Sequence, residues 1–143
     1  MQHLILAIAL LVSSFLFGQG VKQVDQIKNR SIEVKVLNAL NDKGEIHFAL
    51  FTEEGFMKEP KIAKSSQIIN GLSYVTFENI PKGNYAIICF HDENGNKRMD
   101  FHENGMPKES YGTSNNTLNF GPPQFANSKF EMTDEDLTLE IKF

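Results

Sequence analysis

The segment from His91 to Gly105 carries the residues best suited to chemistry, because oxygen-bearing side chains recur in it at regular intervals. Counted from Asp92, oxygen donors fall at positions 1, 3, 5, 7, 9 and 12, the ligand positions of a calcium loop of about twelve residues. They are Asp92, Asn94, Asn96, the backbone carbonyl of Arg98, Asp100 and Glu103. Ca²⁺ prefers about six to eight oxygen ligands, and a chain that curls around the ion presents alternate side chains to it. The spacing therefore predicts a calcium-binding loop over residues 92–103.

This loop differs from a helix-loop-helix calcium site in its turn and in its flanks. Lys97 stands where a glycine normally makes the sharp turn, and the nearest glycine is Gly95. A strand pattern precedes the loop and Gly105-Met106-Pro107 follows it, so neither flank predicts a helix. We therefore expect a calcium loop on a β scaffold rather than an EF-hand.

A metal-free hairpin is the alternative interpretation of the same residues. The dipeptide Asn94-Gly95 favours a two-residue turn, and pairing around it would place Asp92 opposite Lys97 and Phe90 opposite Met99. The acidic residues would then be solvated turn residues, and no ion would bind.

Two enzymatic alternatives have candidate residues in the sequence, but neither set lies in a known catalytic motif. A metal-dependent hydrolase would use His91, His102, Asp92 and Glu103, because imidazole and carboxylate groups suit zinc, but no H-E-x-x-H motif is present. A serine nucleophile at Ser110 or Ser114 would lack the G-x-S-x-G elbow. We therefore expect a protein that is not an enzyme.

A second polar stretch, residues 107–124, suggests a sugar- or peptide-binding surface. Its candidate ligand residues are Tyr111, Ser114, Asn115 and Asn116. The alternative is a lid that Tyr111, Phe120 and Phe125 pack onto the rest of the protein, since Ser, Thr and Asn side chains also bond their own backbone.

Apolar runs, which alternate with polar residues except in the continuous run 85–90, predict the strands that must position these loops. The runs are 32–36, 46–50, 74–77, 85–90, 128–132 and 137–143, and turn-forming residues separate them. We expect Thr52–Ser66 to be a surface connection with Phe56 or Ile62 on the core, and residues 91–124 to be one long connection. This pattern predicts an all-β protein, an antiparallel β-sandwich of immunoglobulin-like or prealbumin-like topology.

The first twenty residues contain no Asp, Glu, Lys or Arg, and Leu4 to Phe17 form a nearly unbroken apolar run shorter than the about 20 residues that span a bilayer. This predicts a signal peptide over 1–20, cleaved between Gly18 and Val21, then a flexible N-terminus over 21–30 and one domain over 31–143. The only cysteine, Cys89, lies in an apolar strand pattern, so we expect a buried thiol and no lipid anchor.

The net charge and the predicted export indicate which classes of binding partner to expect. The formal net charge is −4, which makes nucleic acid an improbable partner. We expect a periplasmic or secreted protein with no stable membrane insertion after cleavage, acting on an envelope partner that the sequence leaves unknown.

Several motifs resemble one family of exported bacterial proteins. They are PKGNYAI (81–87), HDENGN with Asp100 after it, GMPKESYGTSNN (105–116) and FGPPQF (120–125). From Val34 to the end the chain is similar to domain of unknown function 2141, whose members usually carry glycine where Lys97 stands. The resemblance implies export and a β-sandwich, and it implies no activity. The sequence as a whole predicts an exported, non-enzymatic module of the bacterial envelope, either binding or structural.

Overall fold

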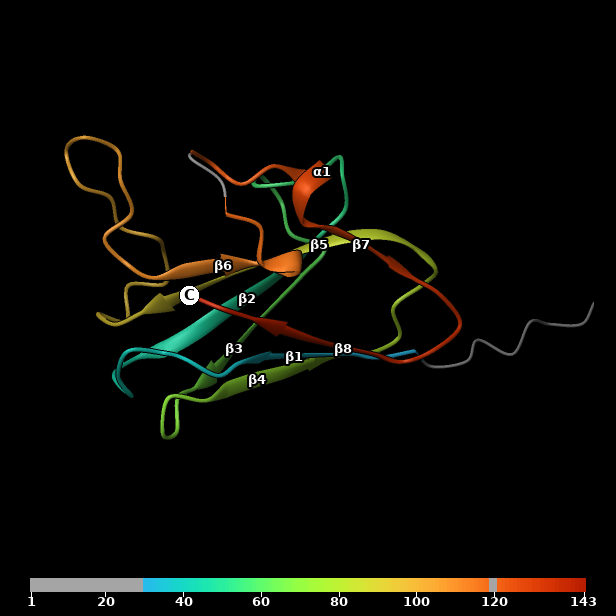
Figure 1. Ribbon diagram of the computed structural model, residues 1–143, viewed down its shortest axis with the longest axis horizontal. Coiled ribbons are helices and arrows are strands. Elements are labelled where there is room, and N and C mark those ends of the chain that lie inside the picture. Colours follow the sequence, from blue (N-terminus) through green and yellow to red (C-terminus); the bar gives the residue numbers. More distant parts are fainter. Residues whose placement is uncertain (1–29, 119–120) are drawn as a thin grey trace, which may run out of the picture.

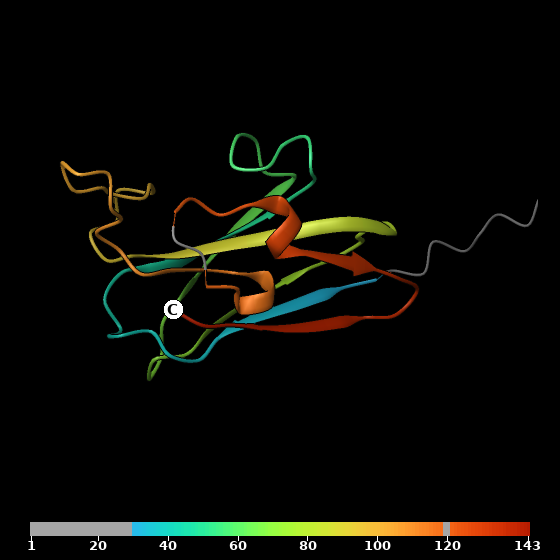
Figure 2. The ribbon, with the colours of Figure 1, turned by 45° about the horizontal axis from the view of Figure 1, so that its top comes forward.

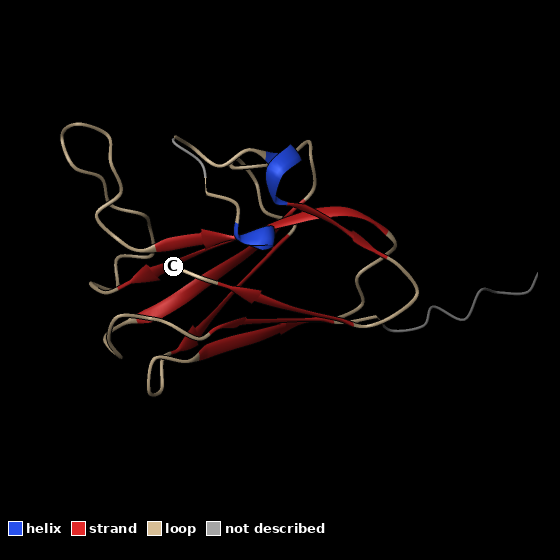
Figure 3. Ribbon diagram, in the orientation of Figure 1, coloured by secondary structure: helices blue, strands red, loops and turns tan. Residues whose placement is uncertain are grey.

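The computed structural model describes residues 30–118 and 121–143. The predicted signal peptide and residues 21–29 of the predicted flexible N-terminus lie outside the described residues. Strands dominate and the helices are short (Figure 3). The elements are β1 (Ile32–Val36), β2 (Glu45–Phe51), β3 (Ile62–Gln67), β4 (Ser73–Phe77), β5 (Gly83–Asp92), β6 (Tyr111–Thr113), the 3₁₀ helix η1 (Ser114–Asn116), α1 (Phe125–Ser128), β7 (Lys129–Met132) and β8 (Leu137–Ile141).

The strands form two sheets that pack as a sandwich, as the alternating pattern predicts (Figures 1 and 2). The three-stranded sheet has the order β4-β1-β8, and the five-stranded sheet has the order β3-β2-β5-β6 with β7 also paired to β5. All pairs are antiparallel except β1 and β8, which run parallel. This pair departs from the expected antiparallel sandwich. It is possible because β1 and β8 come from opposite ends of the described chain and need no hairpin between them.

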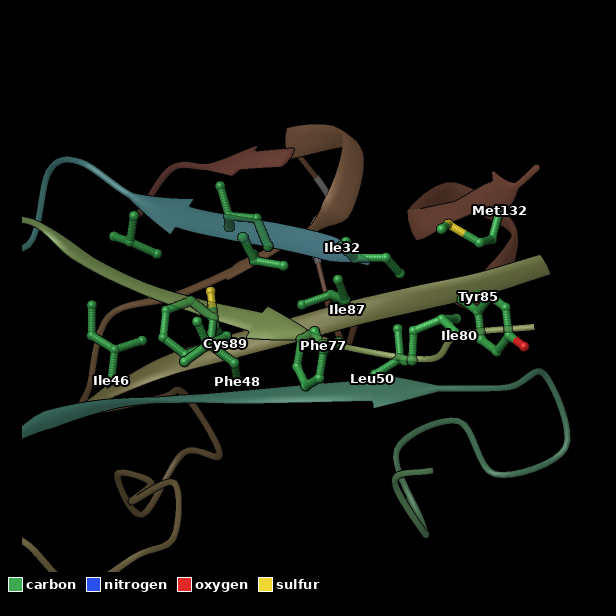
Figure 4. Packing of buried hydrophobic residues seen from close by; sticks show 14 of the residues in the cluster. Ile32, Ile46, Phe48, Leu50, Phe77, Ile80, Tyr85, Ile87, Cys89 and Met132 are labelled. Atoms are coloured by element: carbon green, nitrogen blue, oxygen red, sulfur yellow. The ribbon is translucent and has the colours of Figure 1, made fainter. Parts of the chain in front are cut away.

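The inner faces of the two sheets supply the core, which explains the alternating sequence pattern. Ile32, Val34 and Val36 of β1 are fully buried and face Phe48 and the other inward residues of the second sheet (Figure 4). Cys89 is also fully buried in β5, and burial raises the pKa of its thiol. The prediction of a buried cysteine is therefore confirmed.

Two predicted connections contain strands. Residues Thr52–Ser66 were expected to form a surface connection, but β3 begins at Ile62. This strand lies at the edge of its sheet and exposes most of its side chains, so it shows no alternating apolar pattern. Ile62 packs against the core and the Phe56 ring contacts Phe51, as the sequence suggested for this segment.

The expected 91–124 connection is also interrupted, by β6 and η1. β6 pairs with Ile88–Phe90 and β7 pairs with Gly83–Ala86, both on the edge of β5 opposite β2. Ile87 lies between the two, and its backbone N–H donates to Ser114 Oγ at 2.9 Å. A serine side chain therefore continues the hydrogen bonding of β5 where neither strand reaches.

Residues 93–110 leave the end of β5 and return to the start of β6. They project from one end of the sandwich, next to the β1–β2 loop, in Figures 1 and 2. The two ends of this connection are held by paired strands, so the sheet fixes where the chain departs and where it returns. Neither helix of the described residues has the length and apolar character needed to cross a bilayer.

Candidate functional site

Asp92, the last residue of β5, organises the loop that follows it. Its side chain is fully buried, and its carboxylate accepts four hydrogen bonds. Oδ1 accepts from the backbone N–H groups of Gly95 at 2.8 Å and Asn96 at 3.2 Å. Oδ2 accepts from the backbone N–H of Lys97 at 2.8 Å and from the His47 ring at 3.2 Å. One carboxylate therefore gathers three successive amides and ties the loop to β2.

These contacts also set the charge state of Asp92. Burial by itself raises the pKa of this carboxyl group, but hydrogen bonds from the three backbone amides and from His47 outweigh burial and hold the pKa below its ordinary value of 3.8. Asp92 is thus a carboxylate at neutral pH. A buried negative charge at this point favours cations or N–H donors in the loop above it.

The next oxygen-bearing residues converge on Asp100. The side-chain amides of Asn94 and Asn96 both donate to Asp100 Oδ2, at 2.7 and 2.8 Å. Each asparagine oxygen accepts the backbone N–H two residues ahead, from Asn96 and Arg98 respectively, at 3.0 Å. Local side-chain-to-backbone bonds of this kind curl a chain tightly. The structure therefore holds the side chains of Asn94 and Asn96 against Asp100, while Asp92 binds backbone amides of the same turn.

Lys97 occupies a conformation that normally suits glycine. Its φ is +63°, in the left-handed region, and Gly95 two residues earlier has φ +74°. Position 97 therefore adopts the left-handed turn expected of a calcium loop, although the residue is a lysine. A side chain with a Cβ in this conformation costs about 1 kcal/mol of conformational free energy. The amide of Lys97 points to Asp92 as a result.

The cross-strand pairs expected of a hairpin in this segment do not form. Phe90 pairs with His47 of β2 on one side and with Tyr111 of β6 on the other, so Met99 is not its partner. Lys97 meets Asp92 through its backbone N–H and the carboxylate, not as a cross-strand pair. The hydrophobic requirements of the core set the register of β5 with β2, and this leaves no free edge for a local hairpin.

Glu103 and Arg98 fit the prediction less well. Phe101 bridges Pro107, and within this small turn Glu103 is exposed at the tip. Glu103 forms no hydrogen bond or ion pair with any described residue, so no contact brings it to the other predicted ligands. The predicted ligand at Arg98 was its backbone carbonyl. The Arg98 side chain is largely exposed, and its Nε lies 3.9 Å from Asp100 Oδ1.

Glu109 is the acidic residue that the sequence reasoning missed. Its Oε2 accepts the backbone N–H of Asp100 at 3.1 Å, and the adjacent Lys108 N–H donates to the Asp100 carbonyl at 2.8 Å. Glu109 falls outside the window of a twelve-residue loop, so spacing could not find it. Its position depends on the pairing of β6 with β5.

The residues proposed for a metal hydrolase are separated. His91 is buried on the inner face of β5 and donates from Nε2 to the Lys43 carbonyl at 2.7 Å. Asp92 faces the opposite side of the sheet, because neighbouring strand residues alternate, and His102 is exposed on the small turn with Glu103. Across residues 30–118 and 121–143, no three His, Cys, Asp or Glu side chains gather closely enough to hold a metal by themselves.

Ser114 and Asn115 of the predicted sugar or peptide surface are committed to backbone contacts. Ser114 is fully buried and donates to the carbonyl of Ser128. The Asn115 amide donates to the carbonyls of Asn127 at 3.2 Å and Lys129 at 2.8 Å. These bonds attach η1 to α1 and β7.

Asn116 also bonds backbone groups, at β8 of the three-stranded sheet. Its Nδ2 donates to the Glu140 carbonyl and its Oδ1 accepts the Lys142 N–H, both at 2.8 Å. Tyr111 is partly buried opposite Phe90. The lid interpretation fits these contacts, since Phe125 also packs its ring on Phe56 at 5.5 Å. The third predicted lid anchor, Phe120, lies outside the described residues.

Comparison with known proteins gives one match. No curated protein and no solved structure matches the chain. The model of the family described as "Uncharacterized protein conserved in bacteria (DUF2141)" matches residues 34–140, from β1 into β8 and across the whole loop built on Asp92. The chain therefore belongs to this family of uncharacterised bacterial proteins.

Proposed function

We propose that this protein is an exported, non-enzymatic module of the bacterial envelope whose β5–β6 loop binds Ca²⁺. The observation that carries the proposal is the convergence of Asp92, Asn94, Asn96 and Asp100 around a single turn of chain. Asp100 Oδ2 receives both asparagine amides, and Asp92 lies beneath them at the end of β5. These are hard oxygen-bearing groups of the kind that Ca²⁺ selects.

The polar atoms of the loop have capacity left for an ion. The side-chain oxygens of Asn94 and Asn96 each accept one N–H, which leaves one lone pair on each oxygen. Asp92 and Asp100 supply negative charge, and the amide oxygens add ligands without adding repulsion. A mixed shell of carboxylate, amide and carbonyl oxygens suits Ca²⁺, whereas zinc prefers nitrogen and sulfur ligands, which Asp92, Asn94, Asn96 and Asp100 do not offer.

Local charge also favours a divalent cation. Residues 92–103 hold the acids Asp92, Glu93, Asp100 and Glu103 against Lys97 and Arg98. Like charges held close together in a folded loop repel one another, and a bound cation relieves that repulsion. The unfolded chain cannot reproduce the convergence, so the ion would stabilise the folded state alone.

Calcium binding is tested by thermal melts of the purified protein in millimolar Ca²⁺ and in excess chelator. At about a hundredfold excess over Kd, binding adds about 2.7 kcal/mol to the free energy of unfolding, which raises Tm by several degrees. Metal analysis of the protein as purified distinguishes calcium from stoichiometric zinc. Identical melting curves in calcium and chelator would end the calcium proposal.

Export rests on the uncharged apolar segment at the start of the chain. Intact-mass measurement on envelope and secreted fractions should find a mature chain that begins between Gln19 and Lys22 and carries no lipid. A stable species that still begins at Met1, or one retained in the inner membrane, would contradict export.

A further inference from the structure

We propose that one end of the sandwich docks on an anionic phospholipid membrane through apolar side chains of the β1–β2 loop, the β3–β4 turn and the start of β4. These side chains, called here the turn patch, are Leu37, Leu40, Ile69, Leu72 and Tyr74. Docking of this kind is peripheral and reversible. It is independent of the calcium binding proposed above and uses none of the calcium ligands.

The turn patch exposes side chains that a folded protein usually buries. Leu40 is 78% exposed and Ile69 is 66% exposed. Among the described residues, five of the nine exposed large hydrophobic side chains belong to the patch. Single exposed apolar residues are ordinary, but apolar residues gathered in one place mark a surface that contacts a protein or a membrane.

Hydrogen bonds join the two turns into one surface. Asp42 of the β1–β2 loop accepts backbone N–H groups of the β3–β4 turn with both oxygens, from Asn70 at 2.9 Å and from Gly71 at 2.8 Å. The Ala39 N–H donates to the Gly71 carbonyl at 3.1 Å. The apolar side chains are therefore presented by a fixed backbone, and docking does not have to order these loops first.

The patch lies on projecting turns at one end of the sandwich, the end that also carries the β5–β6 connection (Figures 1 and 2). The Lys43 carbonyl accepts His91 Nε2 at 2.7 Å, which anchors the β1–β2 loop to β5. The β5–β6 connection adds two exposed apolar side chains, Phe101 and Met106. Apolar groups on separate projecting turns suit lipid, which adapts to protrusions, whereas a folded partner must offer a matching surface.

The charges of the two turns suit a surface with anionic headgroups. Asp42 is the sole carboxylate within residues 37–44 and 68–74, and backbone N–H groups bind both its oxygens. Lys43 is exposed and forms no ion pair with any described residue, so its ammonium group is available to a headgroup. Tyrosine and lysine beside leucine and isoleucine match the layers of a membrane surface, with polar groups among the headgroups and apolar side chains below them.

Vesicle co-sedimentation tests the proposal on protein isolated from cells that express the full chain. The probe is vesicles of equal parts phosphatidylcholine and phosphatidylglycerol, compared with vesicles of phosphatidylcholine alone. Excess chelator prevents calcium from bridging protein and lipid, so failure of the calcium proposal leaves this test unaffected. We expect the wild type to sediment with the anionic vesicles, and an unbound wild type would overturn the inference.

The variants Leu40→Ser, Ile69→Ser and Lys43→Gln locate the contact. Burial of one leucine or isoleucine side chain is worth about a factor of ten or more in a binding constant, so each serine variant should weaken vesicle binding by about tenfold. The double serine variant should weaken it by about a hundredfold. Lys43→Gln should weaken binding to the anionic vesicles by about fivefold.

The matched controls are Met57→Ser and Lys58→Gln, because both residues are exposed in the β2–β3 connection, beyond the other end of β2. Both should bind vesicles like the wild type. All variants should keep the wild-type Tm in chelator, since every substituted side chain is exposed. Equal losses in the control and patch variants would mean unspecific adsorption and would overturn the inference.

A second copy of the chain is the alternative occupant of the patch. Analytical ultracentrifugation without lipid measures self-association of the same variants. If the wild type forms dimers that Leu40→Ser and Ile69→Ser dissociate, and binds no vesicles, the patch is an interface between copies and the membrane inference is wrong. A monomer whose vesicle binding depends on Leu40 and Ile69 supports it.

Discussion

Replacing Asp92 with asparagine tests whether this carboxylate organises the β5–β6 connection. Asparagine keeps one oxygen that can accept the N–H groups of Gly95 and Asn96. Its NH₂ group would replace Oδ2, which accepts the Lys97 N–H at 2.8 Å. Two donors would then face each other at a fully buried position.

The cost can be estimated from that one lost contact. A hydrogen bond to a charged group contributes about 1.5–3 kcal/mol, and an unpaired buried donor costs about 1 kcal/mol or more. We therefore expect Asp92→Asn to lower the free energy of unfolding by about 3 kcal/mol, which lowers Tm by about 10 °C for a domain of this size. Thermal melts in excess chelator measure this change in Tm without any contribution from a bound ion.

Glu93→Gln is the matched control, since it removes the same charge from the adjacent, exposed position. It should change Tm by no more than about 2 °C, as surface substitutions usually do. Equal melting points for Asp92→Asn and Glu93→Gln would refute the organising role of Asp92.

The pH dependence of stability in the wild type and in Asp92→Asn is a further test of the charge on Asp92. Folding lowers the pKa of Asp92 below its ordinary value of 3.8, so its contribution is fully present above that pH. It is lost as the pH falls through the lower folded pKa. The difference in stability between wild type and Asp92→Asn should therefore be constant near neutral pH and shrink only below about pH 4.

Three further substitutions test the loop and the lid in chelator. Lys97→Gly should raise Tm by a few degrees because glycine adopts the φ of +63° without strain, and a fall would contradict that account. Ser114→Ala should lower stability by about 2–3 kcal/mol, because the Ile87 N–H would lose its acceptor in the core, and a loss below about 0.5 kcal/mol would refute the bridging role. Gly112→Ala should destabilise strongly because its Cβ would lie 2.5 Å from an Ile141 methyl group, and a Tm equal to wild type would be inconsistent with the packing of β6 on β8.

Several features could be predicted because they depend on neighbours along the chain. Alternation at Ile32, Val34 and Val36 identified β1, and the same rule identified the strands that form most of both sheets. The curl of the loop was also predictable, since Asn94 and Asn96 bond backbone groups two residues ahead. Edge strand β3 was missed because it buries little and so carries no alternating signal.

The polar residues after β6 allowed two interpretations, a ligand surface and a packed lid, for a related reason. Ser114, Asn115 and Asn116 have the composition of a ligand surface, but their donors and acceptors meet backbone groups of other elements. Whether such side chains face solvent or the protein depends on which strands lie beside them. Composition carries no information about that.

The sequence by itself determined the strand pattern, the apolar run from Leu4 to Phe17 and the oxygen-rich turn after β5, because each follows from residue types at short spacing. Only the tertiary structure decided which acidic residue contacts the backbone of Asp100. Glu103 lies within the predicted window but is exposed at the tip of a separate turn, whereas Glu109, just before β6, accepts the Asp100 N–H at 3.1 Å. Register is set by burial of the inner faces and by pairing between residues far apart in the chain, so no local spacing rule can report it.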